Sequence, residues 1–157
     1  MNDYNSTKYR LLILGVGNPL RKDDGIGVHI AHELEKFGMP QGVKVLDAGT
    51  ENLALVDRMR EAPTVVFLDA VEMGENPGTV KLFTQQDVVM VGKKRALSLH
   101  EIGLPQVFFV ASLQGVSPDI VIVGIQPKDL GWGTGLSPEL ERAVPHIVEY
   151  VLAEIAT

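Results

Sequence analysis

The sequence predicts an α/β fold in three layers, with a mainly parallel sheet between layers of helices. Short continuous runs of Val, Ile and Leu, each bounded by Gly, Pro or Asp, are typical of parallel strands that are buried on both faces. Stretches with helical periodicity separate these runs, and alternating strands and helices favour a parallel sheet. The runs that predict buried strands are Leu11–Val16, Val43–Leu46, Thr64–Leu68 and Ile120–Val123.

A fifth strand is predicted at Thr79–Phe83, with a different character. Its residues alternate more in polarity, and it follows the turn signal Asn76-Pro77-Gly78. We therefore expect this strand at the edge of the sheet, in an antiparallel orientation.

The first predicted helix follows the first strand. Apolar residues recur at Ile26, Ile30, Ala31 and Leu34, and Gly38 is a plausible stop signal. A second, shorter helix is marked by apolar residues that end before Pro63, namely Leu53, Val56 and Met59.

Two helices are predicted in the second half of the chain. The stretch 104–113, LPQVFFVASL, has the β-propensity of a strand but the apolar spacing of a helix, and Pro105 suits a first helical turn, so we predict a helix. The last helix starts at Ser137-Pro138, with Ser137 as the N-cap. Its apolar face comprises Leu140, Val144, Ile147, Val148, Val151 and Leu152.

Length and composition limit the possible functions. A chain of 157 residues predicts one domain, 1–157, and the absence of cysteine excludes disulfides and thiolate ligands. No signal-peptide core and no run of 18 apolar residues is found, which predicts a cytoplasmic protein without membrane insertion. The net charge of −6 argues against nucleic acid as a partner, and the basic clusters are short, at Arg21-Lys22 and at Lys93-Lys94-Arg95.

The turn after the first strand is the most informative segment. The stretch 11–27, LLILGVGNPLRKDDGIG, resembles a dinucleotide-binding loop, but that fingerprint requires a third glycine where Leu20 stands. The adjacent carboxylates of Asp23 and Asp24 would repel a phosphate and attract a cation. A nucleotide-binding domain with Asp47 as the ribose acid remains the alternative interpretation.

Acidic residues follow three of the predicted strands. The Asp23-Asp24 pair follows the first strand, Asp47 ends the second and Asp69 ends the third. Ligands of open α/β sheets bind at this carboxyl edge. Carboxylates brought together there repel one another unless a cation or a proton intervenes, so their coincidence predicts a cation site.

A fourth candidate ligand is His100, in a predicted loop just before the helix at 104–113. Asp24, Asp69 and His100 would form an O,O,N ligand set with open coordination positions, which suits nickel, zinc or copper. The other histidines, His29, His32 and His146, lie in predicted helices and are interpreted as surface or packing residues. The Gly-rich loop Pro127–Gly135, which holds the single Trp of the chain, is expected to be loosely structured.

Several motifs, taken together and in order, resemble the hydrogenase maturation endopeptidases, which process the large subunit of nickel–iron hydrogenases. The matching segments span nearly the whole chain: LGVGNPLRKDDGIGV at 14–28, VLDAGT at 45–50, FLDAV at 67–71, LHEIGL at 99–104, VGIQP at 123–127 and GLSP at 135–138.

The resemblance implies a five-stranded sheet and an activity, namely removal of the C-terminal extension from the large-subunit precursor after nickel insertion. It implies metal ligation by Asp24 (Glu or Asp in the family), Asp69 and His100, and a role in activity for Asp47. Nickel would arrive with the precursor, held by its cysteines, and other divalent cations would also fit the site of the isolated protein.

The catalytic group is left open among Asp24, Asp47 and Asp69, any of which would serve as general base, unless the metal itself polarises the carbonyl. The family is grouped with aspartic-type peptidases, although the chain lacks the D-[ST]-G pair of pepsin-like enzymes. A non-enzymatic nickel-binding chaperone or precursor-docking module is the second alternative. A monomer is expected, because the site must admit a large partner.

Overall fold

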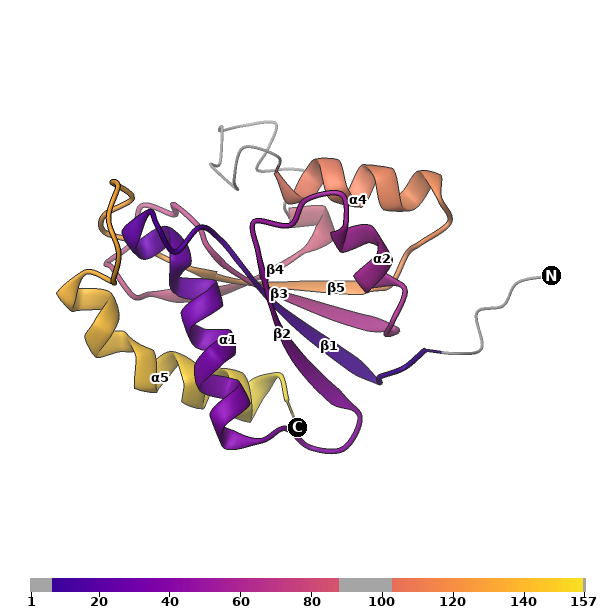
Figure 1. The fold of residues 1–157 in the computed structure, drawn as a ribbon, viewed down its shortest axis with the longest axis horizontal. Helices are drawn as coiled ribbons and strands as arrows, with labels where there is room; N and C mark the ends of the chain where they lie inside the picture. The colour runs from indigo at the N-terminus through magenta and orange to yellow at the C-terminus, as the bar shows by residue number, and fades with distance from the viewer. Residues whose placement is uncertain (1–6, 88–102, 157) are drawn as a thin grey trace.

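The structure, a computed structural model, describes residues 7–87 and 103–156. Its centre is a five-stranded twisted sheet in the order β2-β1-β3-β5-β4 (Figure 1). The strands are β1 (Leu11–Val16), β2 (Val43–Gly49), β3 (Thr64–Ala70), β4 (Val80–Thr84) and β5 (Asp119–Ile125).

Strand directions agree with the sequence analysis. β1 pairs in parallel with β2 and with β3, and β3 pairs in parallel with β5. β4 lies at the edge and pairs antiparallel with β5. The predicted α/β class, with one antiparallel edge strand, is confirmed.

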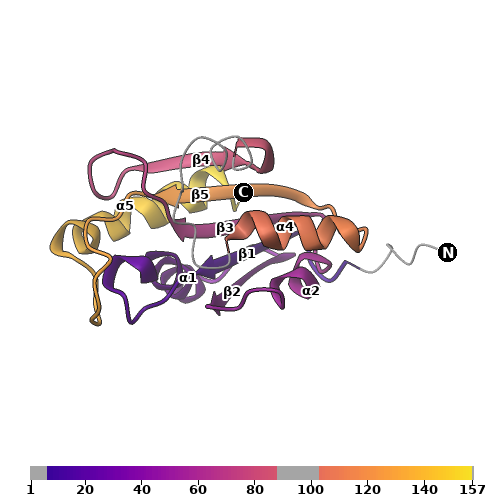
Figure 2. The same ribbon diagram turned by 90° about the horizontal axis from the view of Figure 1, so that it is seen from above.

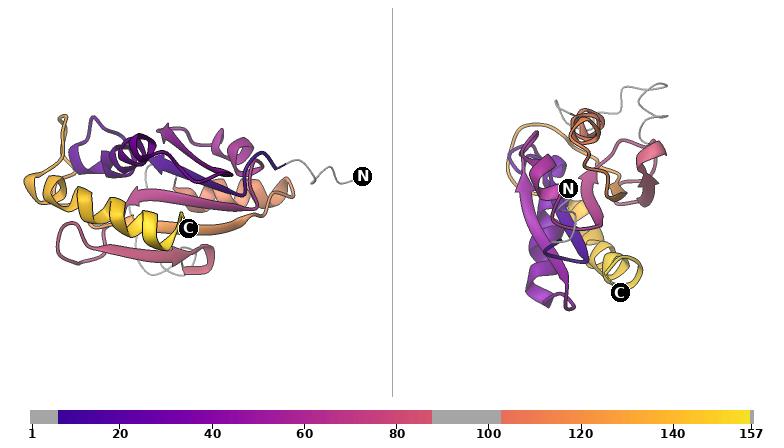
Figure 3. Two further views of the ribbon diagram at one scale, coloured as in Figure 1. Left: turned by 90° about the horizontal axis from the view of Figure 1, so that it is seen from below. Right: turned by 90° about the vertical axis from the view of Figure 1, so that its right-hand side faces the viewer.

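Helices cover both faces of the sheet and complete three layers. α1 and α5 lie on one face, and α2 and α4 on the other (Figures 1 and 3). None of the helices in 7–87 and 103–156 combines the length and apolarity needed to cross a bilayer. The helices are α1 (Ile26–Phe37), α2 (Leu55–Met59), α4 (Leu104–Leu113) and α5 (Pro138–Glu154), with a 3-10 turn, η1, at Lys22–Gly25.

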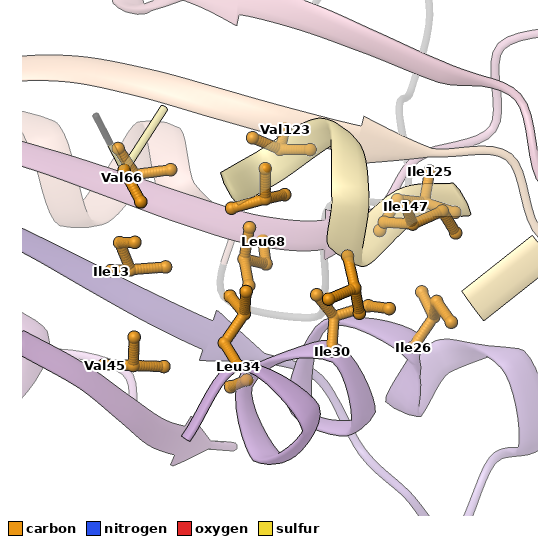
Figure 4. Close-up of a cluster of buried hydrophobic side chains, with 14 of the residues drawn as sticks. Ile13, Ile26, Ile30, Leu34, Val45, Val66, Leu68, Val123, Ile125 and Ile147 are labelled. Carbon is orange, nitrogen blue, oxygen red and sulfur yellow. The ribbon is translucent and has the colours of Figure 1, made fainter. Parts of the chain in front are cut away.

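Each face of the sheet has its own apolar core. On the face of α1 and α5, Ile13 of β1, Leu68 of β3 and Val123 of β5 pack against Ile30 and Ile147 (Figure 4). On the other face, Leu12, Phe67 and Ile122 alternate with these residues and pack under α2 and α4. Because both of their faces are covered, β1, β3 and β5 show continuous rather than alternating hydrophobicity.

The ambiguous stretch 104–113 forms the helix α4. Leu104, Val107, Phe108 and Ala111 are buried on one side, and the Phe108 ring packs against Phe67 with centroids 5.5 Å apart. Helical spacing therefore predicted this element correctly, whereas β-propensity did not, because a single buried stripe at i, i+3, i+4 and i+7 satisfies the core.

Two glycines allow α1 to approach the sheet closely. A Cβ at Gly15 of β1 would overlap the carbonyl oxygen of Gly27, and a Cβ at Gly27 would overlap the carbonyl oxygen of Leu68 in β3. Gly15 and Gly27 therefore serve helix–strand packing, which sets the start of α1 against the carboxyl ends of β1 and β3.

Candidate functional site at the carboxyl edge of the sheet

The strand order creates a switch point between β1 and β3. The chain leaves β1 through α1 on one face, and it leaves β2 through α2 on the other face to reach β3. Connections that diverge in this way open a crevice beyond the carboxyl ends of the strands. Asp24 follows β1 and Asp69 lies near the end of β3, so the fold brings these two carboxylates to the two sides of this crevice.

Asp24 is held within the 3-10 turn η1, which packs against β3. The backbone N–H of Asn18 donates a hydrogen bond of 2.9 Å to its Oδ2. The side chain is largely buried, yet it contributes to the wall of an open cleft. A fixed carboxylate at an accessible surface is suited to binding a cation or a polar substrate group.

Asp69 lies one residue before the end of β3, and both of its carboxylate oxygens are buried. Its neighbours at alternate positions, Phe67 and Val71, belong to the core under α2 and α4. Asp69 therefore points to the same face of the sheet as α4. A carboxylate buried at the end of a strand needs a charge or a hydrogen bond to offset its lost hydration, and such a position at the ligand-binding edge of the sheet is a candidate for function.

Asp47 points to the opposite face of the sheet. Its Oδ2 lies 2.8 Å from Nε2 of His32 in α1, and both side chains are substantially exposed. Alternate residues of a strand point to the same face of the sheet. Val43 and Val45, which alternate with Lys44 and Leu46 in β2, pack in the core under α1, so Asp47 points to that face as well. The structure thus places Asp24 and Asp69 at the carboxyl ends of the neighbouring strands β1 and β3, with Asp24 lining the cleft, and gives Asp47 a partner in α1.

His100, the third predicted metal ligand, lies outside the residues that the structure describes, as does the basic cluster Lys93-Lys94-Arg95. Within 7–87 and 103–156, no three Asp, Glu or His side chains gather into a complete metal-binding group. The donor set Asp24, Asp69 and His100 stays a prediction. The two carboxylates near the switch point have the chemistry of metal ligands.

A cleft with a volume of about 260 Å³ opens beside Asp24. Its walls are formed by the turn after β1, the segment between β2 and α2, the loop after β5 and the first residues of α2 and α4. The residues that line it are Val16, Asn18, Arg21, Asp24, Gly49, Thr50, Glu51, Asn52, Leu55, Leu104 and Trp132.

Glu51 is a charged residue of the cleft wall, and it is already neutralised. The Arg58 guanidinium donates to both of its oxygens, from Nε at 2.7 Å and from Nη2 at 2.8 Å. This bidentate pairing lowers the pKa of Glu51 and raises the pKa of Arg58. The pair fixes the segment before α2 rather than leaving a carboxylate for chemistry.

Asp23, next to Asp24, is fully buried and organises the loop after β5. Its two carboxylate oxygens accept hydrogen bonds from four donors in that loop and at the start of α5. The donors are the backbone N–H groups of Lys128 at 2.9 Å, Asp129 at 2.9 Å and Ser137 at 2.7 Å, together with the Ser137 hydroxyl at 2.7 Å. The two adjacent aspartates therefore have different environments, which their sequence does not distinguish.

The expectation of a loose loop at Pro127–Gly135 is wrong. Besides the Asp23 contacts, Lys22 donates from its backbone N–H to Gly133 and from Nζ to Asp129, at 3.0 and 2.9 Å. In Figures 1 and 2 the orange loop after β5 lies beside the indigo turn after β1. Gly-rich composition indicated flexibility, but hydrogen bonds to distant residues hold the loop in place.

This docking places Trp132 beside Arg21 at the cleft. The Arg21 Cζ lies 5.4 Å from the centroid of the Trp132 ring. Nη2 of Arg21 donates a hydrogen bond of 3.1 Å to the Leu130 carbonyl. Neither Arg21 nor Trp132 was predicted from the sequence to belong to the functional site. A single Trp in a Gly-rich loop was the available signal, but its partner lies more than one hundred positions away.

Comparisons with known proteins identify the family to which the chain is similar. The sequence model of the hydrogenase maturation protease family matches residues 28–154. The hydrogenase expression/formation protein HupD of Bradyrhizobium diazoefficiens is 36% identical over 151 residues, which cover 92% of this chain and 79% of HupD. The hydrogenase 2 maturation protease of Escherichia coli is 33% identical over 149 residues, covering 93% of this chain and 90% of that protein.

Solved structures agree with the sequence relatives. The hydrogenase maturating endopeptidase HybD from Escherichia coli superposes with a TM-score of 0.80 at 33% identity, over 92% of this chain and 90% of that one. The hydrogenase maturation protease HycI from Thermococcus kodakarensis gives a TM-score of 0.75 at 25% identity, over 96% and 95% of the two chains. These similarities confirm the predicted resemblance and displace the nucleotide-binding alternative. This chain belongs to the hydrogenase maturation protease family, a family of peptidases.

Proposed function

We propose that this protein removes the C-terminal extension of a nickel–iron hydrogenase large-subunit precursor after nickel insertion. The observation that carries the proposal is the position of Asp24 and Asp69, two largely buried carboxylates at the carboxyl ends of the neighbouring strands β1 and β3, with a cleft open beside Asp24. Family membership supplies the class of reaction, and these residues supply the place where it would occur.

In this proposal the nickel is part of the substrate. The chain has no cysteine and so offers no thiolate, but carboxylates and an imidazole complement a nickel that the precursor already holds through sulfur. Asp24, Asp69 and His100 would add their oxygen and nitrogen atoms to that nickel. Docking of the precursor through its metal would hold the scissile bond in the crevice, and the gain in effective concentration would supply much of the rate.

The attacking water requires a base or an electrophile. Asp24 is our candidate base, because it is the one of the three predicted carboxylates that lines the cleft. The hydrogen bond from the Asn18 N–H would orient its carboxylate. Asp69 is buried, and Asp47 contacts His32 on the other face of the sheet, so we assign ligand and positioning roles to them respectively.

The test compares nickel-loaded with nickel-free precursor and measures the mass of the large subunit. We expect loss of a C-terminal peptide only from the nickel-loaded form. Binding without any change in mass would assign the chain to the docking-module alternative instead, since the same ligands would serve it.

Variants of the predicted ligands sharpen this test. Asp24→Asn, Asp69→Asn and His100→Ala are expected to abolish cleavage while the protein stays folded, and Asp24→Glu is expected to retain it because a carboxylate remains. Asp57→Asn on the exposed surface of α2 is the matched control. Full cleavage by the Asp24→Asn and Asp69→Asn variants would contradict the assignment.

A further inference from the structure

Two large apolar side chains are exposed on the loops beside the cleft. Trp132 lines the cleft and is 77% exposed, and Leu20 on the neighbouring turn is 58% exposed. The backbone N–H of Gly133 donates to the carbonyl of Leu20 at 2.9 Å, so the two residues lie on segments that are joined directly. Exposed large apolar side chains on neighbouring segments beside a cleft are typical of a surface that binds another molecule.

The exposure of Trp132 is built into the fold. Its loop is fixed on both sides, because Asp129 and Gly133 each form backbone hydrogen bonds with the turn that carries Asp24. The indole is also held by its contact with the Arg21 guanidinium. A side chain that is already positioned in the unbound protein loses little conformational entropy when a ligand packs against it.

Arg21 gives the same region a fixed cation. Among the described residues that line the cleft it is the only basic one, and the Leu130 carbonyl and the Trp132 ring set its orientation. The contact with Leu130 is made by Nη2, so the guanidinium has further N–H donors on its terminal nitrogens. A planar guanidinium with donors in reserve is suited to main-chain carbonyls and carboxylates of a ligand.

We propose that Arg21 and Trp132 form the site that binds the peptide segment of the precursor next to the scissile bond. Trp132 packs against an apolar side chain of this segment, and Arg21 donates to one of its carbonyl oxygens. This inference rests on the proposed function and names the residues that recognise its substrate.

Three features favour an extended peptide as the occupant. The site is continuous with Asp24 in the same cleft. The cleft volume of about 260 Å³ admits one or two side chains rather than a folded surface, since whole drug-sized ligands need roughly 300–1,000 Å³. Along an extended peptide, side chains alternate with main-chain carbonyl groups. The apolar Trp132 ring beside the Arg21 cation matches this alternation.

The test measures the affinity of the full-length protein for nickel-loaded precursor and for the same large subunit without its extension. We expect wild type to bind the precursor more tightly than the shortened form. Trp132→Ala should weaken precursor binding by at least about tenfold and remove this preference, as truncation of a central aromatic contact commonly does. Trp132→Phe should restore most of the affinity, and Arg21→Lys should weaken it because the planar donor is lost.

Phe37→Ala, at the far end of α1, is the matched control for removal of an exposed aromatic side chain, and it should bind as wild type does. Thermal unfolding identifies any variant that fails to fold. In cleavage assays, Trp132→Ala should raise KM while kcat stays within about twofold. The lost contact stabilises the bound substrate and the transition state equally, so its loss weakens binding without slowing the chemical step.

Equal precursor affinity of Trp132→Ala and wild type would overturn the inference, as would a fall in kcat at constant KM. The proposed function has a separate readout, which is the change in subunit mass. If wild type binds through Trp132 but leaves the mass unchanged, the proteolytic function fails and the peptide site stands. If wild type cleaves and Trp132→Ala binds and cleaves equally well, the peptide site fails and the function stands.

Discussion

Nε2 of His32 lies 2.8 Å from Oδ2 of Asp47, on the face of the sheet opposite to Asp69. This pair joins the middle of α1 to the end of β2. Asp47 was a catalytic candidate because the family resemblance implies a role in activity for it and because it ends a predicted strand at the carboxyl edge. Its contact with His32 supports a positioning role instead.

The first prediction concerns this pair. Asp47→Asn and His32→Ala should each lower the cleavage rate by less than about tenfold, and the double variant should lose no more than either single one, since residues that act as a pair are not additive. Rates come from the mass of the large subunit over time. Loss of all cleavage in Asp47→Asn, with His32→Ala near wild type, would show that Asp47 acts directly.

The second prediction concerns Asp23, the buried acceptor that holds the loop after β5. Asp23→Ala leaves three backbone N–H groups and one hydroxyl without their acceptor, so we expect a loss of about 3 kcal/mol in unfolding free energy. Ser137→Ala removes only the hydroxyl bond and should cost about 1 kcal/mol. Urea denaturation measures both, and wild-type stability of Asp23→Ala would refute the role assigned to this carboxylate.

The third prediction concerns Gly27 in the first turn of α1. Replacing a helical Gly by Ala ordinarily stabilises a helix by about 1 kcal/mol. Here the new Cβ would overlap the Leu68 carbonyl, so Gly27→Ala should instead destabilise the protein by about 3 kcal/mol. Glu35→Ala on the exposed side of α1 is the control, with an expected change below about 0.5 kcal/mol. An increase in stability of Gly27→Ala would contradict the close packing of α1 on β3.

The fourth prediction concerns the pH dependence given by Glu51. The hydrogen bonds from Arg58 lower the pKa of Glu51 in the folded protein, so the unfolded state binds the proton more tightly. The pair therefore stabilises the protein above the unfolded pKa of about 4.3, and this contribution is lost as the pH falls through the folded pKa. Since the two side chains are about one-third exposed, the contribution should stay below about 1 kcal/mol.

The comparison of wild type with Glu51→Gln isolates this effect. The unfolding free energy of wild type should fall more steeply than that of Glu51→Gln as the pH drops below about 4.3, the unfolded value for Glu. Identical slopes for the two proteins across this range would show that the Arg58 contact contributes no pH-dependent stability.

Much of the fold was predictable because it depends on local patterns. Continuous apolar runs marked the four parallel strands, and the alternating run after Asn76-Pro77-Gly78 marked the edge strand. The predicted ends were less accurate: β2 and β3 continue to Gly49 and Ala70, so Asp47 and Asp69 lie within strands and not after them. The polar residues suggested that each strand ends there. In the structure, pairing with β1 extends β2 past Asp47, and pairing with β5 extends β3 past Asp69.

The candidate site was predictable only in part. The sequence placed acids at three strand ends, but the face to which each side chain points depends on strand parity and on the helix that covers it. Ser137 shows the same limit. It occupies the N-cap position of α5 as predicted, yet its side chain makes no capping bond and its hydroxyl donates to Asp23. A distant buried carboxylate competes successfully with the local helix terminus.

The sequence by itself determined the α/β class, the strands and helices, the missing third glycine at Leu20 and the set of acidic residues at the sheet edge, because each depends on residue type and short-range spacing. Only the tertiary structure separated Asp24 from Asp23, turned Asp47 toward His32, and brought Trp132 to Arg21 beside the cleft. These arrangements join residues that are distant in the chain, and they arise where the crossovers of the sheet diverge and where buried polar groups require partners.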